Sequence, residues 1–169
     1  MRARFLYNQI IPRKELCAME IIIEKSLRRL TLIREGEPDL TFSIALGKSP
    51  EGHKLSEGDN RTPEGEYYIC TRNDRSNFHL ALGLSYPNPS DAGPALAEAR
   101  ITREQYDSIL SAHAALRRPP WDTSLGGFIM IHGGGSASDW TAGCIALEDC
   151  DIETLFALCP MGTRVLILP

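Results

Sequence analysis

No apolar run in the 169-residue sequence approaches the roughly 18 residues that a membrane-spanning helix needs, so a membrane span is not expected. Positive charge is not in excess either, because 18 Lys and Arg residues stand against 22 Asp and Glu, a net charge of −4. This acidic balance argues against nucleic acid or an anionic membrane surface as a partner. Gly at 14, Pro at 11 and a hydrophobic fraction of 43% are ordinary, and they indicate one globular domain rather than a disordered or collagen-like chain.

Cysteine is scarce as well. Five cysteines are too few for a disulfide scaffold, and because the number is odd, at least one thiol is free or pairs with another molecule. No Cys-x-x-Cys cluster occurs, so a thiolate zinc site has little support and no metal is expected. Cys70 lies in a predicted strand and Cys159 on the apolar face of a predicted helix, so both are expected in the core. For Cys17 and Cys150 a disulfide stays open.

Residues 1–18 do not resemble the domain that follows. Their apolar stretch, residues 5–11, is interrupted by Asn8 and Gln9, whereas a secretory signal has a continuous apolar centre of about 7–15 residues. We therefore expect an N-terminal extension over residues 1–18 without a visible export signal, and one folded domain over residues 19–169. An alternative is a start codon placed too early, because a well-patterned strand begins at Met19.

Short β-branched or alternating segments dominate the rest of the chain and predict strands. The expected strands are residues 20–24, 29–34, 40–46, 66–71, 78–84, 128–131 and 164–168. Thr102 and Gln105 form a capping-box pattern that opens one helix, and a second helix is expected at about 149–158. Residues 86–89 contain two X-Pro steps and are expected to form a loop. The fold class is therefore β-rich α+β, mostly antiparallel, with two main helices.

The chemically informative block runs from His132 to Cys144. His132 ends a predicted buried strand and is followed by Gly133, Gly134 and Gly135, and Cys144 follows 12 residues later, after Gly143. A thiolate is a nucleophile, and an imidazole activates a thiol by taking its proton. No acid follows His132 before Asp139, so a backbone carbonyl within residues 133–135 is the expected orienting group. The amides of Gly143 and Cys144 are candidate oxyanion donors.

By itself this pair is weak evidence, because a cysteine and a histidine occur together in many chains of this length and a free cysteine is usually a small buried apolar residue. The glycines beside His132 and Cys144 are also compatible with plain turn chemistry. Their combination with the upstream sequence is more specific. Ile131-His132-Gly133, Thr141-Ala142-Gly143-Cys144 and the Thr62-Pro63-Glu64-Gly65 turn together resemble the L,D-transpeptidase (YkuD-type) catalytic domain, over most of residues 20–169.

The resemblance implies a YkuD-like sandwich or barrel and a role for each matching residue. Cys144 would be the nucleophile that forms a thioester, and His132 would be the general base. Gly143 with Cys144 would form the oxyanion hole, while Gly133 and Thr141 would orient the reacting groups. The substrates would be peptidoglycan stem peptides, with no metal or organic cofactor.

Two positions depart from the common family pattern. Ala142 stands where many members have His, and Ala146 stands where many have Arg or Asn, which leaves the acyl acceptor open. Trp140 and His79 are further candidates for contacts with substrate, although packing explains a Trp equally well and His79 also fits a structural histidine. His53 and Lys54 lie in a polar loop and are expected to be solvated.

The leading hypothesis is a peptidoglycan L,D-transpeptidase that cross-links stem peptides by acyl transfer through Cys144, located in the cell envelope or periplasm. An L,D-carboxypeptidase would form the same thioester and release it to water. A non-catalytic peptidoglycan-binding module would keep the fold without needing the thiol. The sequence does not indicate an oligomeric state.

Overall fold

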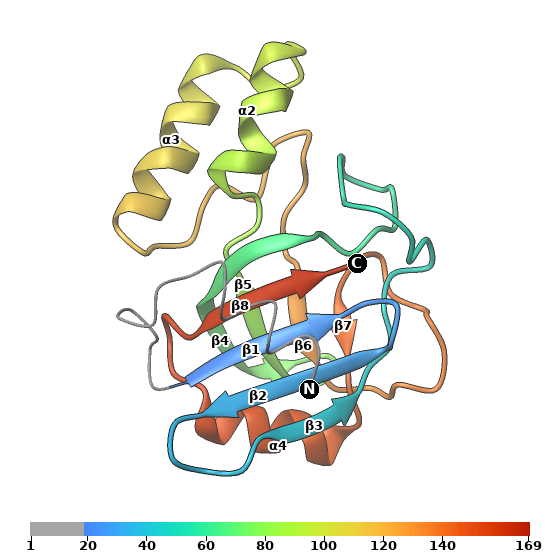
Figure 1. Ribbon diagram of the computed structural model, residues 1–169. Coiled ribbons are helices and arrows are strands. Elements are labelled where there is room, and N and C mark those ends of the chain that lie inside the picture. The colour runs from blue at the N-terminus through green and yellow to red at the C-terminus, as the bar shows by residue number, and fades with distance from the viewer. Residues whose placement is uncertain (1–18) are drawn as a thin grey trace.

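The structure, a computed structural model, describes residues 19–169 as a curled eight-stranded sheet with three helices (Figure 1). The strands are β1 (Met19–Glu24), β2 (Arg29–Arg34), β3 (Leu40–Ser43), β4 (Gly65–Ser76), β5 (His79–Leu84), β6 (Met130–His132), β7 (Ile145–Ala146) and β8 (Arg164–Leu168). The helices are α2 (Pro89–Ala97), α3 (Arg103–Ala114) and α4 (Asp149–Leu158). The predicted extension and the question of the start codon concern residues 1–18, outside the described residues.

The sheet is mixed, with strand order β3-β2-β1-β8-β4-β5-β6-β7. Five neighbouring pairs are antiparallel, whereas β1–β8 and β6–β7 are parallel. The mostly antiparallel, β-rich fold class is thereby confirmed. The last strand, β8, lies between β1 and β4, so the sheet is completed only by the end of the chain.

The β1–β2 hairpin forms as the sequence predicts, with residues 25–28 as its turn. Leu30 and Leu32 alternate with less buried neighbours in β2, and both are fully buried. One continuous core runs beneath the sheet and includes side chains from β1, β4, β5, β6 and β8. On α4, Ile152, Leu155 and the following Cys159 are fully buried, because this helix packs against β5 and β6.

Helix α2 is an addition to the prediction, which expected a loop at residues 86–89 and two main helices. The helix begins at Pro89, its first position, where a proline is tolerated because that N–H has no partner within the helix. Asn88 caps it, and Asp91 returns a bond to the Asn88 amide. The X-Pro pattern therefore marks the start of a helix here. Figure 1 shows α2 and α3 as a hairpin that projects from one end of the sheet.

Several strand ends also differ from the prediction. β3 ends at Ser43, and beyond it Ala45 makes only an isolated bridge to Ala146. β4 continues to Ser76 because the twisted β4–β5 hairpin pairs well beyond the expected end. The two-residue strand β7 was not predicted, since its pairing with β6 depends on tertiary contact rather than on local pattern.

Candidate active site

The predicted base, His132, ends β6, and the predicted nucleophile, Cys144, directly precedes β7, the parallel neighbour of β6. Ile131 pairs with Ile145, and His132 pairs with Ala146, so Cys144 lies beside Met130 at the entrance to β6. The Met130 amide donates to Cys144 Sγ at 3.4 Å, and the thiol donates to Phe128 O at 3.4 Å. The structure thus brings Cys144 and His132 to the same edge of the sheet.

His132 is held by one hydrogen bond and two rings. Its Nδ1 lies 2.6 Å from Gly133 O, within the 133–135 segment expected to supply the orienting carbonyl. Since a carbonyl only accepts, Nδ1 carries the proton, and in the neutral ring Nε2 is left as the acceptor. The Phe78 ring stacks on the imidazole at a centroid distance of 4.6 Å, and Trp140 meets it edge-on at 5.6 Å.

Burial keeps both groups uncharged. It lowers the pKa of His132, which is only 3% exposed, and the bond to Gly133 O partly opposes this shift. Burial also raises the pKa of the Cys144 thiol, opposed by the Met130 amide and by the charge of Lys54. No hydrogen bond joins the thiol to the imidazole within residues 19–169. The resting site is therefore a neutral thiol near a neutral imidazole.

Thr141 organises the turn before the cysteine. Its hydroxyl accepts from the Gly143 amide at 3.0 Å and donates to Cys144 O at 2.8 Å. The Gly143 N–H, expected to serve an oxyanion, already has an acceptor. The Cys144 N–H has no recorded acceptor in the described part of the chain, so only this member of the expected pair is available. Gly133 contributes through its carbonyl, while its amide donates to Phe78 O at 3.0 Å.

Gly143 is required by close packing. Its φ is +133°, and a Cβ on it would lie 2.6 Å from Arg61 O. The loop before the Thr-Pro turn therefore packs directly on the residue that precedes Cys144. Thr62 of that turn is fully buried, and its hydroxyl accepts a hydrogen bond from the Gly47 amide at 3.1 Å. This bond joins the segment after β3 to the same turn.

The remaining predicted site residues lie farther out. Trp140 Nε1 donates to Gly135 O at 3.1 Å, and its ring borders an open hollow of about 300 Å³ that Gly134 and Ser138 also line. Ala142 is exposed. His79 is at the start of β5 and pairs with Glu153 Oε1 at 2.7 Å, so it meets α4 rather than the thiol.

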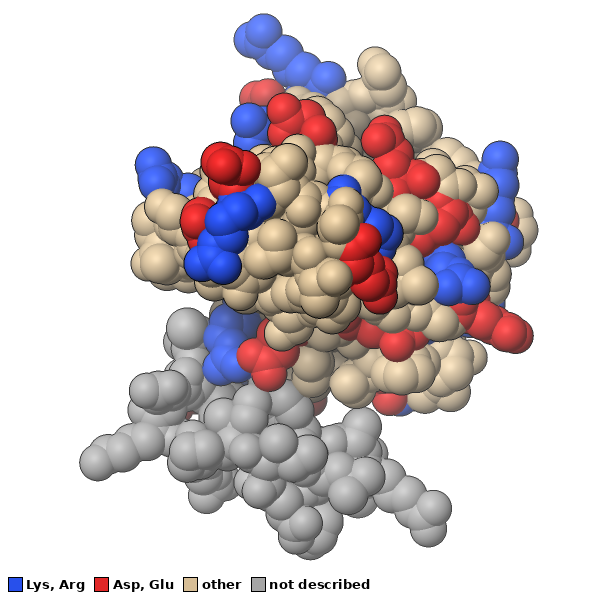
Figure 2. All heavy atoms as spheres, turned by 90° about the horizontal axis from the view of Figure 1, so that it is seen from above, with Lys and Arg blue, Asp and Glu red and all other residues tan. Residues whose placement is uncertain are grey.

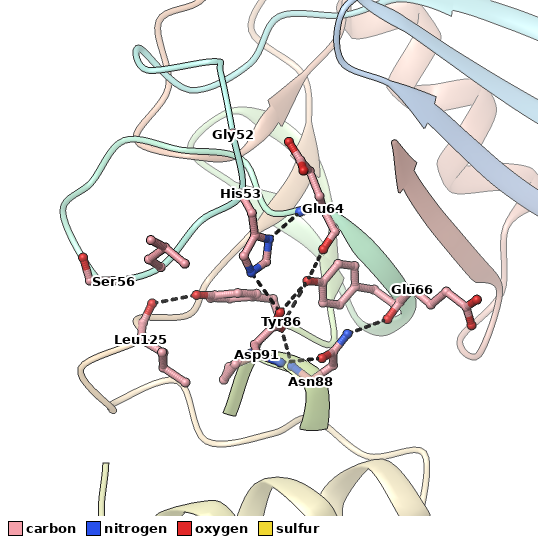
Figure 3. A network of polar contacts seen from close by, with 12 residues as sticks. Gly52, His53, Ser56, Glu64, Glu66, Tyr86, Asn88, Asp91 and Leu125 are labelled. Carbon is pink, nitrogen blue, oxygen red and sulfur yellow. Dashed lines mark hydrogen bonds and ion pairs between the residues drawn. The ribbon is translucent and has the colours of Figure 1, made fainter. Parts of the chain in front are cut away.

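Two residues expected to be solvated are not. Lys54 is 3% exposed and forms an ion pair with Asp59 at 2.8 Å. His53 bridges two elements, since its Nδ1 accepts from the Glu64 amide and its Nε2 contacts Asp91 Oδ1 at 3.1 Å (Figure 3). The polar composition of the loop suggested solvent exposure, but the fold turns these side chains inward, where each finds a partner.

Cys70 and Cys159 are buried, as expected, and Cys150 is exposed. These three and Cys144 are all free thiols, which removes a disulfide among the described cysteines, whereas Cys17 lies outside them. No group of three or more His, Cys, Asp or Glu side chains within residues 19–169 is arranged to hold a metal ion. Over the same residues, no helix has the length and apolarity to cross a membrane.

Sequence reasoning missed Phe78 and Phe128. Phe78, which directly precedes β5, contacts the His132 ring because β5 pairs with β6. No sequence motif predicts this contact. Phe128 has a φ of +55°, which is unusual for a bulky residue. Its side chain is 61% exposed, and its carbonyl accepts the hydrogen bond from the Cys144 thiol.

On the face seen in Figure 2, acidic and basic side chains are interspersed rather than gathered by sign.

Comparison with known proteins agrees with this architecture. The family model for the L,D-transpeptidase catalytic domain (YkuD) matches residues 18–167. The Bacillus subtilis (strain 168) protein named "Putative L,D-transpeptidase YqjB" is 26% identical over 149 residues, which cover 87% of this chain and 69% of that protein.

Solved structures share the fold at low identity. The helical cell shape determining protein Pgp2 from Campylobacter jejuni superposes with a TM-score of 0.62 at 20% identity, over 89% of this chain and 47% of that one. An L,D-transpeptidase from Mycobacterium smegmatis gives a TM-score of 0.53 at 10% identity, over 90% and 59%. This chain thus spans about half the length of these structures. By its family match, and by a fold that these structures share, the chain belongs to the L,D-transpeptidase catalytic-domain family.

Proposed function

We propose that this protein is a peptidoglycan L,D-transpeptidase that forms cross-links through a thioester on Cys144. The observation that carries the proposal is the protonation state of Cys144 and His132. The thiol is neutral, and the imidazole has its only proton fixed on Nδ1 by Gly133 O, so Nε2 is the basic nitrogen near the nucleophile. Family membership supplies the substrate class, peptidoglycan stem peptides.

In the proposed acylation step, His132 Nε2 takes the thiol proton as Cys144 Sγ attacks the carbonyl carbon of a tetrapeptide stem. The Cys144 amide donates to the oxyanion of the tetrahedral intermediate. The imidazolium then returns its proton to the amine of the departing D-Ala, which leaves a thioester. No proton is gained or lost overall.

In the second step, the amine of another stem attacks the thioester carbonyl. His132 accepts a proton from this amine, the new amide bond forms, and the thiol regains its proton. Trp140 lines the hollow and its ring contacts the His132 imidazole, and we assign one stem to this hollow. Ala142 is exposed and Ala146 is buried, and neither brings a charge next to Cys144, so the acceptor is selected by shape and apolar contact more than by a cation at these positions.

The proposal also includes the domain boundaries and the cellular location of the protein. The catalytic domain is residues 19–169, and residues 1–18 are an N-terminal extension. Because stem peptides are found in the cell wall, the site of action is the cell envelope or periplasm. No cofactor takes part, since thioester exchange needs only the thiol and a base.

The test is intact-mass spectrometry after incubation with a purified disaccharide-tetrapeptide, with the soluble products analysed in the same sample. We expect an acyl adduct with loss of D-Ala, and a dimeric product. Cys144→Ala should show neither. Cys150→Ala is the matched control, because it removes an exposed thiol on α4 and should leave both unchanged.

The products separate the alternatives. An adduct with tripeptide alone identifies an L,D-carboxypeptidase with the same nucleophile. Turnover that survives in Cys144→Ala excludes the nucleophile assignment. Binding of the stem without an adduct, equal in wild type and Cys144→Ala, identifies a non-catalytic peptidoglycan-binding module.

A further inference from the structure

Lys54 is a buried cation to which the proposed reaction assigns no role. Its ammonium group pairs with Asp59 Oδ1 at 2.8 Å and donates to Ser56 O at 2.9 Å. Taking an ammonium out of water is costly unless it is paired, and a lysine on a surface loop ordinarily extends into solvent instead. Its burial within a loop between β3 and β4 therefore calls for an explanation.

Asp59 ties this loop into one unit. Besides Lys54, its carboxylate accepts from the amides of Leu55, Ser56 and Arg61, at 2.8, 3.1 and 3.0 Å. Burial acts to raise the pKa of Asp59, but these four hydrogen bonds outweigh it and lower the pKa to about 2. The carboxylate is thus charged at any working pH, and its charge opposes that of Lys54.

The same loop packs against two segments that adjoin Cys144. Arg61 O would be 2.6 Å from a Cβ on Gly143, the residue before Cys144. Glu57 N donates to Ser124 O at 3.0 Å, which joins the loop to the segment that leads to Phe128, the acceptor of the thiol. The loop that holds the ion pair is therefore packed against the residue before Cys144 and joined to the segment whose Phe128 carbonyl contacts the thiol.

Three further titratable or charged side chains belong to the segments named above: His132, Arg61 and Asp59. His132 stands on the β6 side and is neutral at rest. The Arg61 guanidinium is directed toward Gly52, where Nη1 would be 3.8 Å from an added Cβ. Asp59 is already neutralised in part by Lys54. Lys54 is the charged side chain whose field opposes the effect of burial on Cys144.

We propose that Lys54, held by Asp59 in the loop that packs on Gly143, is an electrostatic positioning residue for the Cys144 nucleophile. When the thiol loses its proton, the negative sulfur develops in a buried place where water stabilises it poorly. A fixed cation nearby favours that charge and needs no reorganisation. The inference deepens the proposed function, because it rests on Cys144 as the nucleophile.

A pair of opposite variants tests this role. Lys54→Met and Asp59→Asn both break the same ion pair, so a structural defect would change Cys144 in the same direction in both. An electrostatic effect has opposite signs, because the first removes the cation and the second leaves it uncompensated. The readout is the rate of Cys144 alkylation by iodoacetamide between pH 6 and 10, by peptide mapping, with Cys150 as the reference thiol in the same molecule.

At pH 7 we expect Lys54→Met to slow Cys144 alkylation about threefold or more and Asp59→Asn to accelerate it by a similar factor, as for a thiol pKa moved by half a unit or more. Lys54→Arg keeps the charge and should stay within about twofold of wild type. Cys150 should be unaffected in all variants. If Asp59→Asn does not fold, the Met and Arg variants alone decide.

Rates that change in the same direction in Lys54→Met and Asp59→Asn, no change in Lys54→Met, or an Arg variant as slow as Met would each overturn the proposal. Because alkylation needs no stem peptide, this result is separate from the test of function. A protein without an acyl adduct but with opposite alkylation shifts would refute the transpeptidase and keep only the electrostatic effect of Lys54 on the Cys144 thiol.

Discussion

At the scale of single residues, the site depends on small backbone contacts. The proton of His132 is placed by Gly133 O, and the thiol of Cys144 is held between Met130 N and Phe128 O. Thr141 uses its one hydroxyl both as acceptor and as donor, and so fixes the backbone on each side of Cys144. These contacts decide protonation and direction, which are the properties that acyl transfer needs.

The pH dependence of turnover should reveal the neutral pair. The basic form of His132 is required, and burial lowers its pKa below the usual 6.5, so the acid limb of kcat/KM should lie below pH 6.5. Burial raises the thiol pKa above 9.0, so the alkaline limb should lie above pH 9. Steady-state rates from pH 4 to 10.5 measure both. An acid limb at or above pH 6.5 would contradict this assignment.

A second residue-scale prediction concerns Gly143. Gly143→Ala should lower the free energy of unfolding by about 2–4 kcal/mol and abolish acylation, because the Cβ would collide with Arg61 O and the backbone would keep a φ that alanine disfavours. The matched control is Gly93→Ala in α2, where a Cβ meets nothing within 4 Å. It should gain about 0.5–1 kcal/mol. Urea unfolding of both variants makes the comparison, and equal effects would refute the packing argument.

At the scale of elements, α2 is joined to the sheet and to the loop before β4 by one carboxylate. Asp91 is 5% exposed at its side chain, and it receives bonds from the Asn88 amide, the Tyr67 hydroxyl and His53 Nε2 (Figure 3). Burial raises the pKa of Tyr67, and Asp91 adds to the shift, so the phenol stays a donor. The helix hairpin thus has one polar anchor at its base.

Removing that anchor should cost more than removing an ordinary helix cap. Asp91→Ala should lower the free energy of unfolding by about 2–4 kcal/mol, because it leaves the buried Tyr67 hydroxyl and His53 N–H without their partner. Thr102→Ala, which opens the exposed capping box of α3, should cost about 1 kcal/mol. Urea denaturation followed by circular dichroism ranks the two. A larger loss in Thr102→Ala would show that Asp91 is not the anchor.

At the scale of the whole molecule, the order of strands makes the fold interdependent. β8 comes last in the sequence yet lies between β1 and β4, and the active-site strands β6 and β7 lie beyond β5 at one edge. A substitution that destabilises β8 should therefore also destabilise β5, β6 and β7 at the far edge of the sheet. The two tryptophans report on that edge, because Trp121 contacts Phe128, just before β6, and Trp140 contacts His132 at the end of β6.

Ile167→Ala, at a buried position of β8, should lower the free energy of unfolding by about 2–5 kcal/mol. Leu166→Ala, at the half-buried neighbour, should cost about 1–2 kcal/mol. Tryptophan fluorescence and circular dichroism should give the same midpoint in each variant, because one cooperative unit unfolds. Separate midpoints would mean that the β5–β7 part of the sheet is stable without β8.

Local sequence patterns were enough to predict several strands and helices, the fold class and the family of this protein. The alternation in residues 29–34, the capping box at Thr102 and the β-rich class follow from the sequence, because each depends on neighbours in the chain. The motifs that contain His132 and Cys144 are also local, but the pairing of β6 with β7 that brings these motifs together is a tertiary contact. The motifs were also enough to indicate the family. Only the tertiary structure decided the stacking of Phe78 on His132, the occupied Gly143 amide, the burial of Lys54 and the half-buried place of His53. These contacts join residues far apart in the sequence, and whether a polar side chain is buried depends on partners that no local pattern specifies.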